Sequence, residues 1–533
     1  MPWSEINEQK DNLYRLSLKG LTNLEKASWE ASPHELLMCQ MKGQSEESCH
    51  NFVKVLLSNG RKLFACGTSA FSPSCTWREV LLSNGRKLFA CGTSAFSPSC
   101  TWREMENINH ITDTLRGVAK CPYSPYANIT SLMTLSGQYF AGSPMDFSGT
   151  DFAIIRDLGP SSLRTKHYNA LWLNEPQFVG SFETDAFVYF VFREEAVEYM
   201  NCGKKVYSRI ARVCKNDTGG AIMLKDNWTS FVKARLNCSL PGEYPFYLDE
   251  VQGMTYLPDE GLLYATFTTP HNSIPGSAVC AFNLTSINEA FRGDFKYQRN
   301  AASAWERAPR SDYHGQCSGG SSNQMEDSAY NYQLMDSAVH PTTERPLYFN
   351  SMETLTHIAV DVLPTKVHRA VHVMYVATVE GLVKKISVLA RTQTTCVLEI
   401  WKPLPPNLPD STIYSMHFLK DTESVYLGTN SGVLRIPADH CARHQSKQAC
   451  LNAMDPYCGW NELKLKCMPP PQHDPLASHW YQKATECPIL NHPVDGGWSA
   501  WSGGPTVLKS QVTAACLCPT PVIVKPDPDE MGC

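Results

Sequence analysis

The stretch VYLGTNSGVLRIP, residues 425–437, places a turn-forming segment between two short apolar runs. Runs of β-branched and aromatic residues on either side of a short turn containing Asn and Gly predict an antiparallel hairpin. The same design occurs in VMYVATVEGLVKKIS, residues 373–387. Two hairpins of one design, separated by roughly 50 residues, are typical of the blades of a β-propeller.

The rest of the chain is also rich in short β-like runs. AFVYFVF (186–192), LLYATFT (262–268) and VHVMYVAT (371–378) combine Val, Phe, Tyr and Thr and are bounded by Gly, Asn, Asp or Pro. Helical signals are fewer, and NWTSFVKARLN (227–237) is the best of them, with Phe231, Ala234 and Leu236 near helical spacing. These patterns predict an all-β fold.

Composition excludes several classes of protein. The chain has 533 residues, of which 43% are apolar, so a large core is available and disorder is not the main state. Lys and Arg number 47 against 52 acidic residues, for a net charge of −5, which argues against nucleic acid as the main partner. The sequence contains no run of about 18 apolar residues that would span a bilayer.

Cysteine and asparagine point to the secretory pathway. There are 21 cysteines, without the paired C-x-x-C clusters of a structural zinc site. Five N-x-S/T sequons predict N-glycosylation, at Asn128, Asn216, Asn227, Asn237 and Asn283. The first ten residues, MPWSEINEQK, lack the basic start and apolar core of a signal peptide. We therefore interpret the sequence as cut short at its N-terminus and expect an extracellular or cell-surface protein.

An identical tandem repeat occupies residues 55–79 and 80–104, each reading VLLSNGRKLFACGTSAFSPSCTWRE. Architectural repeats diverge and need several copies, so we interpret this pair as a recent duplication or an assembly error. Only one copy is expected to occupy a blade. The first has the longer leading strand, from Asn51 to Leu57, so we expect it in the blade, with Leu63 and Phe64 buried. The second is expected to be extruded over residues 80–104, with Leu88 and Phe89 exposed.

The amino-acid composition changes near residue 441, where five cysteines fall within residues 441–487. So short a segment cannot bury enough surface by itself, which predicts a small disulfide-stapled module. Within it, DPYCGW (455–460) predicts a turn that carries a bridged cysteine, with Trp460 covering the bridge. GGWSAWS (496–502) follows, and the Pro-rich tail to Cys533 has no pattern that predicts a fold.

DPYCGW resembles the signature of the plexin–semaphorin–integrin module. Upstream, the chain resembles a sema domain from about Leu13 to Pro437, and so resembles a semaphorin. The matching stretches, in family order, are CGTSAFSPSC, AKCPYSP, WLNEPQFVGSF, YSRIARVCKND, WTSFVKARLNC, SAVCAFNL and GTNSGVLRIP. GGWSAWS is similar to the start of a thrombospondin type 1 repeat, which favours class 5. The alternative for Trp498 and Trp501 is a pair of ordinary aromatic residues in a linker.

The resemblance implies a fold and a domain order. The fold is a seven-bladed sema β-propeller, followed by a small disulfide-rich module. The propeller is N-terminally incomplete, because family members pair an N-terminal strand into the last blade and this sequence lacks that strand. The implied domains are the propeller at 1–437, the cysteine-rich module at 438–488, and a truncated thrombospondin repeat with an unstructured tail at 489–533.

The resemblance also implies disulfide pairs. In the propeller these are Cys39–Cys49, Cys66–Cys75, Cys238–Cys396 and Cys280–Cys317, and in the second copy of the repeat Cys91 is expected to pair with Cys100. In the module they are Cys441–Cys458 and Cys450–Cys467. Partners for Cys121, Cys202, Cys214 and Cys487 stay open.

Signals for an enzyme are absent from the sequence. It has no G-x-S-x-G elbow and no H-E-x-x-H motif, so we expect no catalytic residue, no metal and no cofactor. His440 and His444 flank Cys441, but that cysteine is better used as the first bridge of the module. Lys204-Lys205 and Lys384-Lys385 are interpreted as pairs of solvated charges, with an anionic partner such as a sulfated glycosaminoglycan as the functional alternative.

The resulting hypothesis is an extracellular guidance ligand without catalytic activity. The resemblance implies that its propeller binds a plexin-type receptor, and that a homodimer of the ligand clusters two receptors. The candidate contact residues follow the 186–192 run and precede the next apolar run: Arg193, Glu194, Glu195, Lys204 and Lys205. The alternatives are the ectodomain of a sema-domain receptor and, third, a propeller enzyme.

Overall fold

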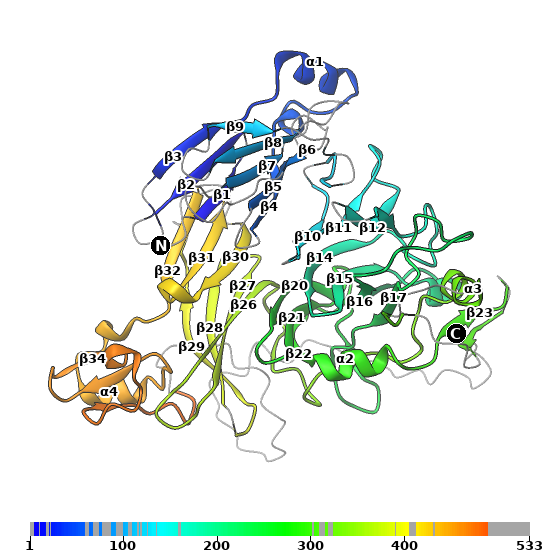
Figure 1. The fold of residues 1–533 in the computed structure, drawn as a ribbon. Helices are drawn as coiled ribbons and strands as arrows, with labels where there is room; N and C mark the ends of the chain where they lie inside the picture. Colours follow the sequence, from blue (N-terminus) through cyan, green and yellow to red (C-terminus); the bar gives the residue numbers. More distant parts are fainter. Residues whose placement is uncertain are drawn as a thin grey trace, which may run out of the picture.

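The fold is an all-β propeller followed by a small module, as Figure 1 shows for a computed structural model of the chain. The structure describes residues 5–9, 11–17, 21, 23–58, 63–67, 74–76, 87–91, 100–104, 109–113, 117, 120–124, 126–134, 136–157, 161–300, 303–308, 315–317, 323–389, 391–403, 412–429 and 432–488.

Four blades have four antiparallel strands each. The strands of the first two are β10 (Thr130–Met133), β11 (Tyr139–Pro144), β12 (Phe152–Asp157) and β13 (Leu163–Arg164), then β14 (Gln177–Glu183), β15 (Phe187–Glu195), β16 (Val206–Cys214) and β17 (Val232–Arg235). The strands of the next two are β20 (Glu250–Leu257), β21 (Leu262–Thr268), β22 (Ser277–Asn283) and β25 (Tyr348–Asn350), then β26 (Leu355–Leu363), β27 (Val371–Thr378), β28 (Val383–Val388) and β29 (Thr395–Trp401).

Three further blades show three strands each among the described residues. They are β1 (Glu5–Gln9), β2 (Asn12–Leu16) and β3 (Asn23–Ser28), then β4 (Val53–Ser58), β5 (Leu63–Gly67) and β6 (Ser74–Thr76), then β30 (Ile413–Leu419), β31 (Ser424–Thr429) and β32 (Gly432–Pro437). The first strands of successive blades lie side by side, from β4 through β10, β14, β20 and β26 to β30. β1 lies beside both β4 and β32, which closes a ring of seven blades.

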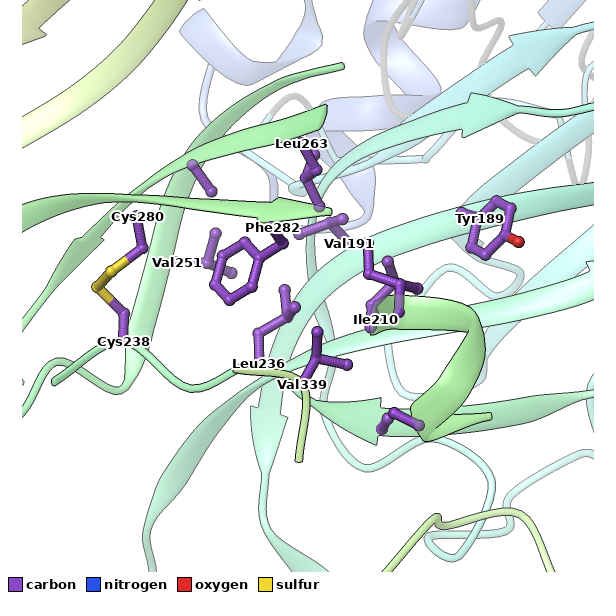
Figure 2. Packing of buried hydrophobic residues seen from close by; sticks show 14 of the residues in the cluster. Tyr189, Val191, Ile210, Leu236, Cys238, Val251, Leu263, Cys280, Phe282 and Val339 are labelled. Atoms are coloured by element: carbon purple, nitrogen blue, oxygen red, sulfur yellow. A yellow bond between two sulfur atoms is a disulfide. The ribbon is translucent and has the colours of Figure 1, made fainter. Parts of the chain in front are cut away.

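The central strands of the blades carry long apolar runs because a neighbouring blade covers each of their faces. In β15 every residue from Val188 to Phe192 has no exposed surface. Figure 2 shows the side chains between two blades, where Val191 and Ile210 of one blade face Leu263 and Phe282 of the next. This double burial explains why continuous apolar runs, and not strict alternation, marked the strands in the sequence.

The helix expected at 227–237 is wrong, since β17 occupies residues 232–235 of this segment and pairs with β16. Val232, Ala234 and Leu236 point into one core cluster, and the spacing of two is the period of a strand. The helices that the structure does describe are short: α1 (Pro33–Met41), α2 (Leu284–Ala290), α3 (Asn323–Asn331) and α4 (Lys447–Asn452).

The duplication is accommodated differently from our expectation. The first copy supplies β4, β5 and β6, and β4 stands in the ring between β1 and β10, as predicted. The second copy is not extruded: its β7 (Lys87–Cys91) and β8 (Cys100–Glu104) form a sheet with β9 (Ile111–Asp113), and β7 lies against β5. Each copy carries both strands of a hairpin, so each can form its own ladder wherever it lies.

The side chains of both copies lie outside the described residues. The burial of Leu63 and Phe64 and the exposure of Leu88 and Phe89 therefore stay predictions. Only the backbone register bears on the two bridges expected there. Cys66 stands directly opposite Cys75 in the β5–β6 ladder, and Cys91 stands opposite Cys100 in the β7–β8 ladder.

Three disulfides agree with expectation and two pairings are wrong. Cys39–Cys49, Cys441–Cys458 and Cys450–Cys467 are present. In place of Cys238–Cys396 and Cys280–Cys317, the structure has Cys238–Cys280, Cys214–Cys317 and Cys396–Cys487. Cys238 follows β17 and meets Cys280 of β22 across the junction of two adjacent blades, as Figure 2 shows, whereas Cys396 lies on β29, a further blade away.

The cysteine-rich module is packed against the propeller. It contains α4, β33 (Gly459–Asn461), β34 (Lys466–Met468) and β35 (Trp480–Tyr481). One core cluster joins its bridges Cys441–Cys458 and Cys450–Cys467 and its Trp460 to propeller residues of β27 and β31, including Val373, Tyr375 and Val425. The Cys396–Cys487 bridge ties the end of the module to β29. Propeller and module therefore share a core.

Gly459 in the DPYCGW motif tests this packing. A Cβ at this position would overlap the Trp480 indole and lie 2.6 Å from the Tyr481 carbonyl oxygen. We predict that Gly459→Ala lowers the free energy of unfolding by about 1–3 kcal/mol, because close-packed neighbours cannot yield. Gly242→Ala is the control, since a Cβ there would have no neighbour closer than 3.6 Å. Equal urea midpoints for the two variants would contradict the prediction.

Candidate partner-binding surface

One face of the propeller carries the loops that lead from each blade into the next. Neighbouring strands of a blade are antiparallel, so the loop between the second and third strands leaves the same face as the loop that leads into the next blade. We call this the loop face, made of residues 145–151, 165–176, 196–205, 236–249, 269–276, 351–354 and 379–382. Nine large apolar side chains are exposed on it: Phe147, Tyr168, Leu171, Met200, Tyr244, Tyr247, Ile274, Met352 and Val379. Exposed apolar side chains on loops held by a rigid scaffold favour a protein-binding surface.

A cluster of tyrosines and cations lies on this face, at the ends of β16 and β17 and on the loop that follows them. The Arg235 guanidinium carbon lies 3.8 Å from the ring centre of Tyr207 and 4.9 Å from that of Tyr247. Lys205 Nζ lies 5.3 Å from the Tyr207 ring centre. Asp249 holds both cations, 2.8 Å from Arg235 and 3.2 Å from Lys205. Stacked tyrosine and arginine side chains in fixed geometry are the composition of binding hot spots.

One of the five predicted contact residues belongs to this cluster, and two more pair with each other next to it along the chain. Lys204 is 78% exposed and its Nζ lies 2.9 Å from Glu195 Oε1, while Lys205 belongs to the cluster itself. The most exposed aromatic residue of the face, Tyr244 at 87%, lies on the neighbouring loop 236–249. The sequence did not identify Tyr207, Arg235 and Tyr247, because they come from separate strands and loops that only the fold brings together.

The other two predicted contact residues are engaged inside the protein. Arg193 is partly buried, and its Nη1 donates to the Val251 carbonyl (2.6 Å) and to Gln252 Oε1 (3.1 Å). Glu194 is wrong as a contact residue, because its side chain is fully buried. Successive residues of β15 point to opposite sides of the sheet, so Glu194 faces inward where Glu195 faces out.

Glu194 belongs to a buried group of four charges. Its Oε1 accepts from Arg209 Nε (2.9 Å) and Lys233 Nζ (2.6 Å), and Glu198 Oε2 accepts from Arg209 Nη2 (2.6 Å). We call Glu194, Glu198, Arg209 and Lys233 the buried quartet. Burial alone would raise the pKa of Glu198, but the charge of Arg209 outweighs it and holds that pKa at about 2. The quartet carries two charges of each sign and therefore compensates itself.

A second set of buried charges joins the propeller to the module. Lys385 Nζ donates to Asp455 Oδ2 (2.6 Å) of the DPYCGW motif and to the Ala438 carbonyl (2.7 Å), and both ionised side chains are buried. Tyr457, which belongs to the same motif, donates to Oδ2 of Asp361 in the propeller (2.5 Å). The interpretation of Lys384-Lys385 as solvated charges is therefore wrong, since Lys384 is also buried and pairs with Glu353.

The histidines near Cys441 have structural partners. His440 Nδ1 lies 2.9 Å from Glu399 Oε2, and Arg443 also binds Glu399. Burial by itself would raise the pKa of Glu399, but the hydrogen bond of His440 and the charge of Lys385 lower that pKa to about 2. Cys441 is bridged to Cys458. Among the described residues no group of three or more His, Cys, Asp or Glu side chains could hold a metal ion.

The predicted glycosylation sites differ in access. Asn128 and Asn216 are exposed, while Asn237 and Asn283 are partly buried, and Asn283 caps α2. Asn227 is buried and its Nδ2 donates to the Arg164 carbonyl (3.1 Å), which leaves no room for a glycan in the folded protein.

Comparison with known proteins shows the family. Residues 248–417 match the model of the Sema domain, and residues 440–488 match the Plexin repeat. Semaphorin 5c of Drosophila melanogaster is 48% identical over 98% of this chain, and human Semaphorin-5B is 40% identical over 96%. The aligned part is 46% and 43% of those two relatives, so the chain spans slightly less than half of their length.

Solved structures agree with the fold. The extracellular domains 1–2 of Drosophila Semaphorin 1a superpose with a TM-score of 0.76 at 31% identity, covering 92% of this chain and 98% of that one. A chain of the complex of Drosophila Plexin A with Semaphorin 1b gives the same score at 31% identity, covering 91% and 95%.

A seven-bladed propeller whose last blade leads directly into a cysteine-rich module defines a sema-domain protein. The chain belongs to the semaphorin family, and its similarity to Semaphorin 5c and Semaphorin-5B places it in class 5.

The Lys385–Asp455 pair supports a stability test. We predict that Asp455→Asn lowers the free energy of unfolding by about 3–5 kcal/mol, because it removes the nearer counter-charge of a buried lysine, whose other carboxylate, Glu399, lies 3.9 Å away. The matched control is Glu462→Gln in the same module, whose pair with Lys447 is exposed and should change stability by less than about 1 kcal/mol. Urea unfolding followed by tryptophan fluorescence measures both. Similar losses in the two variants would mean that the buried pair does not hold the module.

Burial also makes a prediction for glycosylation. In protein secreted from animal cells, we expect a glycan at the exposed Asn216 and none at Asn227, as measured by mass spectrometry of glycopeptides. Occupancy at Asn227 in folded protein would contradict the buried hydrogen bond to Arg164.

Proposed function

We propose that this chain is the receptor-binding part of a non-catalytic extracellular guidance ligand, and that it binds a plexin-type receptor through the loop face. The observation that carries this proposal is that nine exposed apolar side chains and a tyrosine–cation cluster share one face of a rigid propeller. A similar chain belongs to the complex of Drosophila Plexin A with Semaphorin 1b. Such a function requires shape and a fixed array of contacts, and no reactive group.

The comparisons favour the ligand over the receptor alternative. The extracellular region of Plexin A4 superposes with a TM-score of 0.62, but at 16% identity it shares the fold alone. The semaphorin structures are about twice as similar in sequence, at 31% identity. Among the described residues no helix is long and apolar enough to cross a membrane. We propose an extracellular or cell-surface location for the part that the structure describes.

Two further properties belong to the same proposal. A homodimer would present two loop faces and so bring two receptors together, which sedimentation velocity would test. A sulfated glycosaminoglycan is proposed to bind at Lys204, the most exposed cation among the predicted contact residues, and heparin affinity chromatography of Lys204→Glu would test it. No loss of heparin affinity in that variant would remove the glycosaminoglycan from the proposal.

The experiment is binding of the folded chain to a panel of plexin ectodomains by surface plasmon resonance. We predict that Tyr247→Ala or Arg235→Ala weakens binding to the plexin that responds by tenfold or more, because the cluster loses a stacked side chain. Ile222→Ser is the control, since Ile222 is exposed on a loop of the opposite face. If the folded protein binds no plexin of the panel, the proposed function is overturned. Equal losses of affinity in all three variants would overturn the assignment of the face.

A further inference from the structure

The loop that carries Met200, Lys204 and Lys205 rests on the buried quartet. This loop, residues 196–205, contains the short 3₁₀ segment Val197–Cys202. Glu198 of that segment points inward and accepts from Arg209 Nη2 at 2.6 Å, while Met200 points outward and is exposed. Arg209 is fully buried in β16 and cannot follow a moving loop, so the ion pair ties the loop to the blade.

The same quartet holds the neighbouring loop, residues 165–176. Glu194 Oε2 accepts from the Asn174 backbone N–H (3.1 Å), and the Asn174 carbonyl in turn accepts from the Glu195 N–H (3.1 Å). Asn174 Nδ2 also donates to the Glu195 carbonyl (3.1 Å). Tyr168 and Leu171, exposed on the loop face, belong to this loop. Two loops that meet a partner are thus fixed to one another by charges that a partner cannot reach.

Holding a surface loop in this way costs desolvation free energy, because four ionised side chains must leave water. Apolar packing of equal volume would stabilise the blade at least as well, yet it would not fix the orientation of loop 196–205. A charge-assisted hydrogen bond between Glu198 and Arg209 specifies one orientation of the loop, since the guanidinium donates along fixed directions.

We infer that Glu198 is a positioning residue for partner binding: through Arg209 it pre-orders loop 196–205 in the conformation that the partner meets. The inference rests on the proposed function. A loop that samples other conformations before binding lowers the apparent affinity by the fraction of competent molecules. Glu198 therefore acts on binding although the partner contacts Met200, Lys204 and Lys205.

Two variants of one residue test position against charge. Glu198→Gln keeps the length and removes the charge, whereas Glu198→Asp keeps the charge and shortens the side chain by one methylene group, which moves the loop or breaks the pair. The control is Glu183→Gln, in the same blade but at the opposite face, where Glu183 Oε2 lies 2.5 Å from Lys215 Nζ. Arg209 keeps its ion pair with Glu194 in both variants, and Glu198→Asp carries the test if Glu198→Gln does not fold.

The first measurement needs no partner. Hydrogen exchange reports on the Ala196 N–H, which donates to the Lys205 carbonyl (2.8 Å), and on the Tyr199 N–H, which donates to the Ala196 carbonyl (3.1 Å). We expect both variants to exchange these amides at least tenfold faster than the unmodified chain, with Glu183→Gln unchanged. Unchanged exchange in both Glu198 variants would overturn the inference.

The second measurement is binding to the plexin ectodomain that responds in the panel. We expect both Glu198 variants to bind at least tenfold more weakly, mainly through a slower association rate, with Glu183→Gln unchanged. Normal binding by Glu198→Asp beside weak binding by Glu198→Gln would assign a direct role to the charge and overturn the positioning role. If no plexin binds the unmodified chain, only the proposed function is overturned, because the hydrogen-exchange measurement still decides whether Glu198 orders the loop.

Discussion

Each blade of this propeller is covered on both faces, and that mutual covering is the constraint on which the structure depends. Val188 to Phe192 are entirely buried only because the next blades stand on either side of them. A twisted sheet with two apolar faces is not stable alone, so the ring must close. Closure occurs where β1 lies beside β4 and β32. The ring has one place for the duplicated segment, which β4 of the first copy takes, and the second copy adds a sheet of its own without changing the order of the blades.

Buried charges have two roles in this molecule, and both concern geometry. The quartet around Arg209 lies beneath the loops of the candidate surface, and the Lys385–Asp455 pair lies between propeller and module. Each pairs an acid on one element with a base on another, so each is satisfied at one relative position of the two elements. Ion pairs of this kind contribute less to net stability than to a unique arrangement. Together with the Cys396–Cys487 bridge, the second set makes the module an extension of the last blades.

What the sequence determined by itself is local. The hairpins at 373–387 and 425–437 and the all-β class follow from neighbours a few residues apart, whereas the bridges Cys441–Cys458 and Cys450–Cys467 were implied by the resemblance of DPYCGW to a known module. The segment 227–237 was misjudged because its apolar spacing fits a helix nearly as well as a strand, and pairing with β16 decided it.

Only the tertiary structure decided which charges face inward and which distant cysteines meet. Glu194 and Glu195 are adjacent and chemically alike, yet one is enclosed by Arg209 and Lys233 and the other pairs with the exposed Lys204. Cys238 bonds to Cys280 and not to Cys396, because adjacent blades bring the first pair together. The cause is common to both cases: burial and long-range contact depend on which blades stand side by side, and the closed ring sets that order.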